Sequence, residues 1–191
     1  MNDRKHIANI HSNRFENEGL VYSSEVIDRN DLMLLKDFAL DCIQNNPYCA
    51  KFLDLILSIT LCQGAANHYA VCQGYAKHYL NSTKNGIKDF DIWFFFKKEE
   101  GKIFNPRWRA KKDLGETKFG KNPDDIGFMG RRVDFFGRSI AFSNMNIEDS
   151  IRHWLRYGGG PSPRCLSQKA VVGLYPEDVF GTVIWVNSDL T

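Results

Sequence analysis

The sequence has no long apolar run, few cysteines and almost no net charge. None of its hydrophobic stretches approaches the roughly 18 uninterrupted apolar residues that a membrane-spanning helix needs. The polar residues after Met1 also lack the apolar segment of a secretory leader. Lys and Arg number 25 against 23 Asp and Glu, a net charge of +2, which excludes nucleic-acid binding through overall positive charge. We therefore expect a cytoplasmic protein with no membrane partner, in which any nucleic-acid contact depends on local charge.

The cysteines form no CxxC pair, and their number is odd: Cys42, Cys49, Cys62, Cys72 and Cys165. This pattern favours free thiols in a reducing compartment over a disulfide framework. His68 and Cys72 have a spacing that two zinc ligands on one helix can have, but no second pair completes a four-ligand site. We expect buried structural thiols.

The length of 191 residues is that of one globular domain. Residues 1–29 are polar and predict an N-terminal arm, which leaves 30–191 as a single domain. Apolar residues recur at helical spacing in five segments, which predicts helices over 30–46, 49–61, 65–81, 146–157 and 162–174. Runs typical of strands lie at 89–96, 132–136, 137–142 and 182–186. This mixture indicates an α/β (α+β) domain.

Two aspartates, Asp89 and Asp91, stand at the start of an aromatic strand. Alternate residues of a strand point to the same face, so both carboxylates project together with Trp93 and Phe95, away from the layer that takes the residues between them. Paired carboxylates repel each other, and a divalent cation removes that repulsion while leaving positions free for water and phosphate. Mg²⁺ or Mn²⁺ suits this all-oxygen set of ligands.

A third aspartate, Asp134, lies in a later apolar strand between Val133 and Phe135. If this strand pairs with the first, three carboxylates converge, and two ions roughly 3.5 to 4 Å apart would activate an attacking hydroxyl and stabilise a leaving pyrophosphate. Asp134 would then be a metal ligand and a candidate general base. The alternative is that Asp89 caps its strand and Asp134 pairs with a neighbouring arginine.

The turn Gln63-Gly64-Ala65 leads into the helix predicted over 65–81. Free backbone N–H groups and the helix dipole at such a turn can hold a phosphate, because glycine has no side chain to keep the ligand off the main chain. Ordinary turn chemistry is the alternative.

Cations and aromatic residues, Trp108 among them, gather in residues 97–121. Such a segment can follow a nucleic-acid backbone while an aromatic ring stacks on a base. Acidic residues interrupt the cations, so a solvated loop is the alternative.

Taken in order, these motifs resemble the nucleotidyltransferases of the DNA polymerase beta-like superfamily, in particular the compact bacterial branch of abortive-infection and toxin–antitoxin transferases. The resemblance covers roughly residues 55–175 and rests on a glycine turn, a pair of acids, a third acid and a later lysine: Gly64-Ala65, Asp89-Phe90-Asp91, Val133-Asp134-Phe135 and Lys169.

The resemblance implies a small mixed sheet that carries the acids and is flanked by helices. It assigns Mg²⁺ or Mn²⁺ to Asp89, Asp91 and Asp134, nucleotide phosphates to Gly64 and Ala65, and the triphosphate to Lys169. Ala65 stands where the family usually has Ser or Gly, which removes a hydroxyl contact and leaves the backbone one. Lys169 lacks the Arg-rich and Asp motif that usually follows, and an exposed helix lysine is the alternative.

The activity that the resemblance implies is transfer of a nucleoside monophosphate from an NTP to an unidentified hydroxyl acceptor: RNA or tRNA, a protein or a small molecule. The toxin–antitoxin branch also implies an inhibitory protein partner. An inactive nucleotide- or nucleic-acid-binding module and a metal-dependent nuclease are rival interpretations. A restriction-type nuclease would place a lysine where this sequence has Phe136. His68, His78 and His153 receive no role, because a structural histidine is the more common case.

Overall fold

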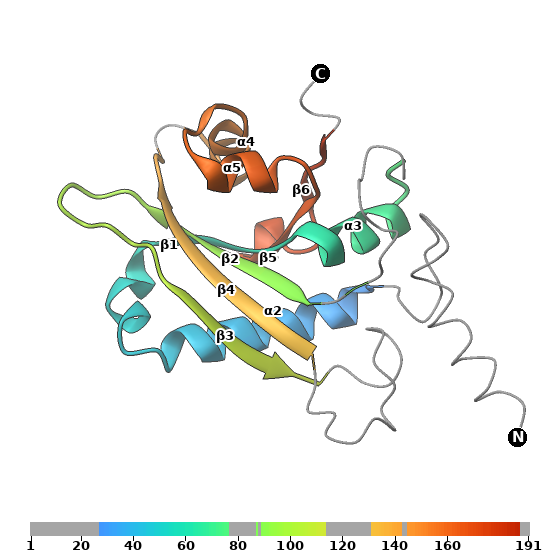
Figure 1. The fold of residues 1–191 in the computed structure, drawn as a ribbon, viewed down its shortest axis with the longest axis horizontal. Coiled ribbons are helices and arrows are strands. Elements are labelled where there is room, and N and C mark those ends of the chain that lie inside the picture. The colour runs from blue at the N-terminus through green and yellow to red at the C-terminus, as the bar shows by residue number, and fades with distance from the viewer. Residues whose placement is uncertain (1–26, 77–86, 88, 114–130, 143–144, 188–191) are drawn as a thin grey trace, which may run out of the picture.

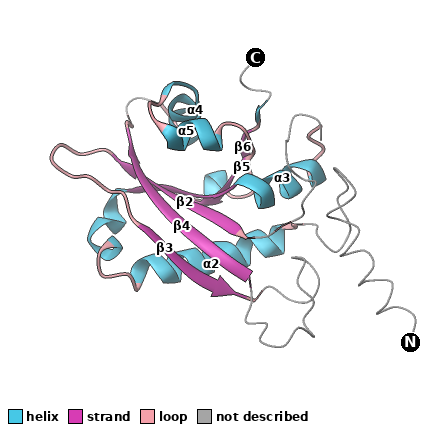
Figure 2. Cartoon of the chain, viewed as in Figure 1, coloured by secondary structure: helices cyan, strands magenta, loops and turns pink. Residues whose placement is uncertain are grey.

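Six strands form one sheet in the computed structural model, which describes residues 27–76, 87, 89–113, 131–142 and 145–187 (Figure 1). The strands are β1 (Ile56–Cys62), β2 (Phe90–Lys97), β3 (Arg107–Lys112), β4 (Arg131–Ile140), β5 (Val171–Tyr175) and β6 (Val183–Trp185). Their order across the sheet is β3-β4-β2-β1-β5-β6, and Figure 2 shows helices on both sides of it. The predicted α/β class is confirmed as a mixed α+β arrangement with a mixed sheet.

Strands β2 and β4 run parallel, whereas every other neighbouring pair is antiparallel. The parallel pair arises because the chain leaves β2, forms β3 at the sheet edge and returns as β4 between them. Residues 137–140, which the sequence predicted to open a separate strand, continue β4. This path brings the acidic start of β2 beside the acidic part of β4.

Helix α2 (Arg29–Gln44) covers one face of the sheet and lies behind it in Figure 1. It begins one residue before the predicted Asn30, because Asp28 accepts hydrogen bonds from the backbone N–H groups of Asn30 and Asp31 at 2.8 and 3.0 Å. Its apolar side packs against alternate residues of β2, in a core that includes Leu32, Leu35, Ala39, Phe90, Ile92, Phe94 and Phe96.

Helices α4 (Ile147–Tyr157) and α5 (Pro161–Leu166) cover the opposite face. Asn146 caps α4 as predicted, and its side chain accepts a hydrogen bond from the Asp149 backbone N–H at 2.7 Å. The core on this side includes Trp93, Phe95, Ile140, Ile151, Leu155 and Leu166. The alternation predicted along the aromatic strand is therefore confirmed, since its two sets of aromatic residues enter two different cores.

The helix predicted over residues 49–61 is wrong. A 3₁₀ helix, η2 (Cys49–Leu55), is followed directly by strand β1. Strand β1 lies between β2 and β5, and its two faces enter the two cores, with Ile59 and Leu61 on the α2 side and Leu57 and Cys62 on the other. A short run that is buried on both faces is difficult to separate from a buried helix by periodicity alone.

The helix predicted over residues 162–174 is also wrong in its second half. Helix α5 ends at Leu166, and Val171 begins strand β5. Helix α3 (Gln63–Cys72) confirms the first part of the helix predicted over 65–81, whose last residues lie outside the described chain. Most of the predicted N-terminal arm also lies outside it, and Ile27, near the end of that arm, is fully buried.

Candidate active site

A single row across the sheet carries two of the three predicted acids. Asp91 of β2 lies directly opposite Asp134 of β4, and Asp134 lies opposite Arg109 of β3. On its other side Asp91 lies opposite Cys62, the last residue of β1. Side chains in one such row point to the same face, and Asp89 shares that face because it precedes Asp91 by two residues. The sheet thus brings the three carboxylates to one place.

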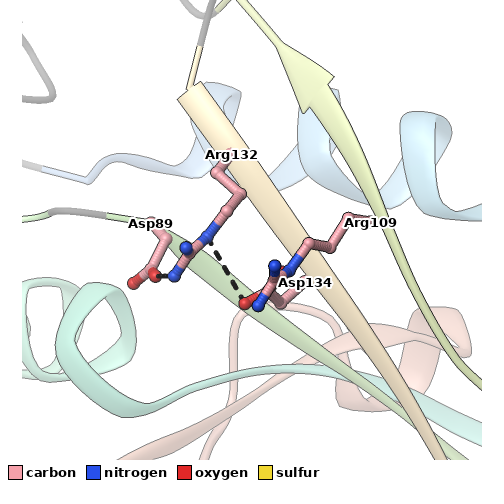
Figure 3. A network of polar contacts seen from close by, with 4 residues as sticks. All are labelled: Asp89, Arg109, Arg132 and Asp134. Atoms are coloured by element: carbon pink, nitrogen blue, oxygen red, sulfur yellow. Dashed lines mark hydrogen bonds and ion pairs between the residues drawn. The ribbon is translucent and has the colours of Figure 1, made fainter.

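Two arginines pair with the outer carboxylates (Figure 3). Arg109 Nε donates to Asp134 Oδ1 at 2.7 Å. Arg132 lies between Asp134 and Asp89. Its Nε is 3.4 Å from Asp134 Oδ2, and its Nη2 donates to Asp89 Oδ2. The side chain of Asp134 is only 6% exposed, against 26% for Asp89. Asp134 therefore pairs with neighbouring arginines, as the alternative predicted, and it also lies beside the other two acids.

The middle carboxylate, Asp91, receives no hydrogen bond or ion pair from any described residue. Burial raises the pKa of Asp91 to about 7, and the negative charges of Asp89 and Asp134 add to this rise. The positive charges of Lys169 and Arg132 oppose it. Asp91 is therefore a half-buried acid between two like charges, an environment that a cation would relieve.

Within the described residues, no group of three or more acidic, histidine or cysteine side chains is arranged to hold a metal ion. Arg132 pairs with one oxygen of Asp89 and one of Asp134. The chemistry of the donors still fits Mg²⁺ or Mn²⁺, since all three are carboxylates and Asp91 has both oxygens unpaired by the described chain. Asp89, Asp91 and Asp134 are the residues that would hold the ion.

The predicted phosphate turn follows β1 and so begins next to Asp91. Gln63 has a left-handed backbone conformation, with φ of 64°, and starts α3. A Cβ atom added to Gly64 would meet nothing within 4 Å, so the backbone at this position faces open space. The Ala65 side chain, in contrast, is buried in the core on the α2 side. Ala65 as a whole is only 1% exposed, so the open backbone at this turn is that of Gly64.

Lys169 lies in the turn between α5 and β5, so the prediction that places it on a helix is wrong. Its charge lowers the pKa of Asp91, which puts it close enough to act on the acidic row. The next residue is tied to α3, because the Ala170 backbone N–H donates to Asn67 Oδ1 at 2.7 Å. The end of β1, the start of α3 and the Lys169 turn therefore form one side of the site.

A cavity of about 460 Å³ lies on the same face of the sheet as the acids. Its lining includes Gln63, Trp93, Arg107, Phe136, Arg138 and Ser162. Trp93 follows Asp91 by two residues and Phe136 follows Asp134 by two, so the cavity begins one step along the strands from the carboxylates. Sequence analysis missed it, because its walls come from segments far apart in the chain.

The basic segment predicted over 97–121 contributes β3, and residues 114–121 lie outside the described chain. Trp108 is stacked on Phe94 and Phe135, with ring centroids 5.5 and 4.8 Å apart. It packs on the α2 side of the sheet and is half-buried, and its stacking on a base stays a prediction. Arg107 and Arg109 point to the other face, toward the cavity and the acids.

All five cysteines are free thiols. Cys49 and Cys62 are buried as predicted, whereas Cys72 and Cys165 are exposed. Of the unassigned histidines, His68 is fully buried, His153 packs on Tyr157 at the surface of α4, and residue 78 lies outside the described chain.

No family model matches the chain, and no curated protein matches it either. Among the described residues, no helix has the length and apolar content needed to cross a membrane.

Proposed function

We propose that this protein is a metal-dependent nucleotidyltransferase with a nucleotidyltransferase-like fold, which moves a nucleoside monophosphate from an NTP to a hydroxyl acceptor. The observation that carries the proposal is the register that sets Asp91 beside Asp134, with Asp89 on the same face. Bound Mg²⁺ or Mn²⁺ would supply charge stabilisation of the phosphates and activation of the hydroxyl. The acceptor is an RNA such as tRNA, a protein or a small molecule, and an inhibitory protein partner belongs to the same proposal.

The reaction balances without any further reactant. The acceptor oxygen forms a bond to the α-phosphorus, and the bond from that phosphorus to the oxygen bridging to the β-phosphate breaks. Pyrophosphate leaves, and the acceptor hydroxyl loses its proton. In the proposed reaction Asp134, the candidate general base, would accept that proton.

The remaining residues have roles that follow from their positions. The backbone at Gly64 is open to a phosphate at the start of α3, next to the strand end that adjoins Asp91. Lys169 brings a positive charge to the same side, toward the triphosphate. Arg132, half-exposed beside Asp89, is free to turn toward phosphate when the ion takes over the carboxylates.

A binding module without catalytic activity is the second candidate, and the two arginine pairs favour it. Arg109 and Arg132 neutralise Asp89 and Asp134 without any metal. A nucleotide would then bind at the Gly64 turn without turnover.

The test is incubation of purified protein with each labelled NTP, Mg²⁺, total RNA and a mixture of proteins and small hydroxyl compounds. We expect a labelled product with the native chain, none with Asp91→Asn, and the native yield with Asp178→Asn, which changes an exposed acid outside the site. A rise in melting temperature with NTP but no product with any acceptor would favour the binding module. Loss of nucleic acid with Mg²⁺ and no NTP would identify a nuclease instead.

A further inference from the structure

The cavity beside the acids contains two arginines that have no acidic partner among the described residues. Arg107 of β3 and Arg138 of β4 both line it. No ion pair joins either of them to an Asp or Glu of the described chain. Two positive charges that share one cavity without compensation are the usual condition for binding an anion.

Arg138 is held in place by neutral groups. Its Nε and Nη2 donate to Ser162 Oγ at 3.2 and 3.0 Å, and its Nη1 donates to the Gly137 carbonyl at 2.7 Å and to Asn105. These contacts fix the position of the guanidinium, and none of them brings a negative charge from the described part of the chain. Burial lowers the pKa of Arg138, which shows that this charge is poorly solvated.

Two aromatic rings support the guanidinium groups. Trp93 and Phe136 stack on each other with centroids 4.8 Å apart, Arg138 lies 5.4 Å over the Trp93 ring, and Arg107 lies 5.2 Å over the Phe136 ring. Cation–π contact with a ring orients a guanidinium without occupying its N–H groups. The side chain of Arg107 is exposed and makes no hydrogen bond to a described residue, so its guanidinium N–H groups are available to a ligand.

The groups that can bind phosphate lie on both sides of Asp91 in the sheet. The Gly64 turn and Lys169 adjoin β1 and β5, on one side of the acidic row. Arg107 and Arg138 belong to β3 and β4, on the other side, and the cavity between them extends to Gln63 at the start of the turn. If the Gly64 turn and Lys169 take the triphosphate of the NTP, the arginine pair is left for a phosphate of the acceptor.

We propose that the cavity between Arg107 and Arg138 binds a phosphate group of the acceptor, so that the acceptor is a phosphorylated compound whose hydroxyl reaches the acids. The row of Trp93 and Phe136 is about 7 Å along the strands from the row of Asp91 and Asp134, a span that a sugar phosphate covers. The assignment to the acceptor rests on the proposed function. The phosphate site itself rests on the two arginines alone.

The test uses ribose 5-phosphate, with ribose as the phosphate-free control, in calorimetric titrations with EDTA and no metal. We expect the native chain to bind the phosphorylated sugar and not ribose. Arg107→Gln should weaken this binding about tenfold or more, because a charge-assisted contact is lost. Arg138→Gln should weaken it as well, and Lys51→Gln, which changes an exposed lysine outside the cavity, should leave it unchanged.

Melting curves of each variant separate lost binding from lost folding, and Arg107→Gln is the decisive variant because Arg107 is exposed. Equal affinity of the native chain and folded Arg107→Gln for ribose 5-phosphate would overturn the proposed site. A matching loss of Mn²⁺-dependent NTP binding in Arg107→Gln would overturn its assignment to the acceptor. Phosphate binding that depends on Arg107 in a protein that transfers no nucleotide would leave the site standing and refute the proposed function instead.

Discussion

The half-buried carboxyl of Asp91 predicts that this protein loses stability as pH rises, unless a cation is bound. The pKa of Asp91 rises from 3.8 to about 7 on folding, so between these values the folded chain holds a proton that the unfolded chain has released. The free energy of unfolding therefore falls as pH increases through this window. A difference of about 3 in pKa corresponds to about 4 kcal/mol in total, of which about 2–3 kcal/mol is lost between pH 5 and pH 8.

Urea unfolding in EDTA at pH 5, 6, 7 and 8 measures this effect when the native chain is compared with Asp91→Asn. The variant has a neutral side chain of the same shape, so its advantage over the native chain should grow by about 2–3 kcal/mol from pH 5 to pH 8. Asp178→Asn, at an exposed position, should follow the native profile. Added Mg²⁺ at pH 8 should stabilise the native chain and not Asp91→Asn. Native and Asp91→Asn profiles that stay parallel would refute the raised pKa that burial and the two neighbouring acids give Asp91.

Three further predictions concern single positions. Arg132→Gln should raise the affinity for Mn²⁺ several-fold in calorimetric titration, because the guanidinium that competes for Asp89 is removed, and an unchanged or lower affinity would contradict this competition. Gly173→Ala should lower the free energy of unfolding by about 1–3 kcal/mol in urea, since the new Cβ would lie 2.1 Å from the Val179 carbonyl oxygen; native-like stability would show that the backbone adapts. Asp28→Ala should lower the free energy of unfolding in urea by about 1 kcal/mol, because it removes the N-cap of α2. No change would mean that water replaces the cap.

The alternation along β2 could be read from the sequence because strand geometry is local. Residues two apart point to one face whatever the strand pairs with, so the separation of Phe94 and Phe96 from Trp93 and Phe95 needed no knowledge of the fold. The same argument placed Asp89 and Asp91 on one face. Whether they approach Asp134 could not be read from the sequence, because it depends on the pairing of two strands that are distant in the chain. In the structure these strands pair because the chain returns as β4 between β2 and β3.

The elements that sequence analysis missed depend on contacts that are not local. Strand β1 resembles a helix in sequence because residues on both of its faces are buried in the two cores, which weakens the alternation that marks a strand. Lys169 was placed on a helix for a similar reason, since the run 162–174 changes from α5 to β5 without a glycine or proline between them. The arginine-lined cavity joins five separate segments, and of its two arginines only Arg107 lies in a stretch that the sequence singled out, the basic segment 97–121. Only the register of β3 on β4 brings them together.

The two arginine pairs differ in strength, and this difference decides how the site would open to a cation. Arg132 is 48% exposed and its partner Asp89 is 26% exposed, so this ion pair is worth about 1 kcal/mol at most. Even millimolar metal binding corresponds to about 4 kcal/mol, which exceeds the loss of that pair. Arg109 donates at 2.7 Å to an Asp134 side chain that is 6% exposed, a contact that is harder to break. Because Arg109 uses Oδ1 and Arg132 lies against Oδ2, the outward turn of Arg132 alone would free an oxygen on Asp134 and on Asp89 while Arg109 continues to hold Asp134 in place.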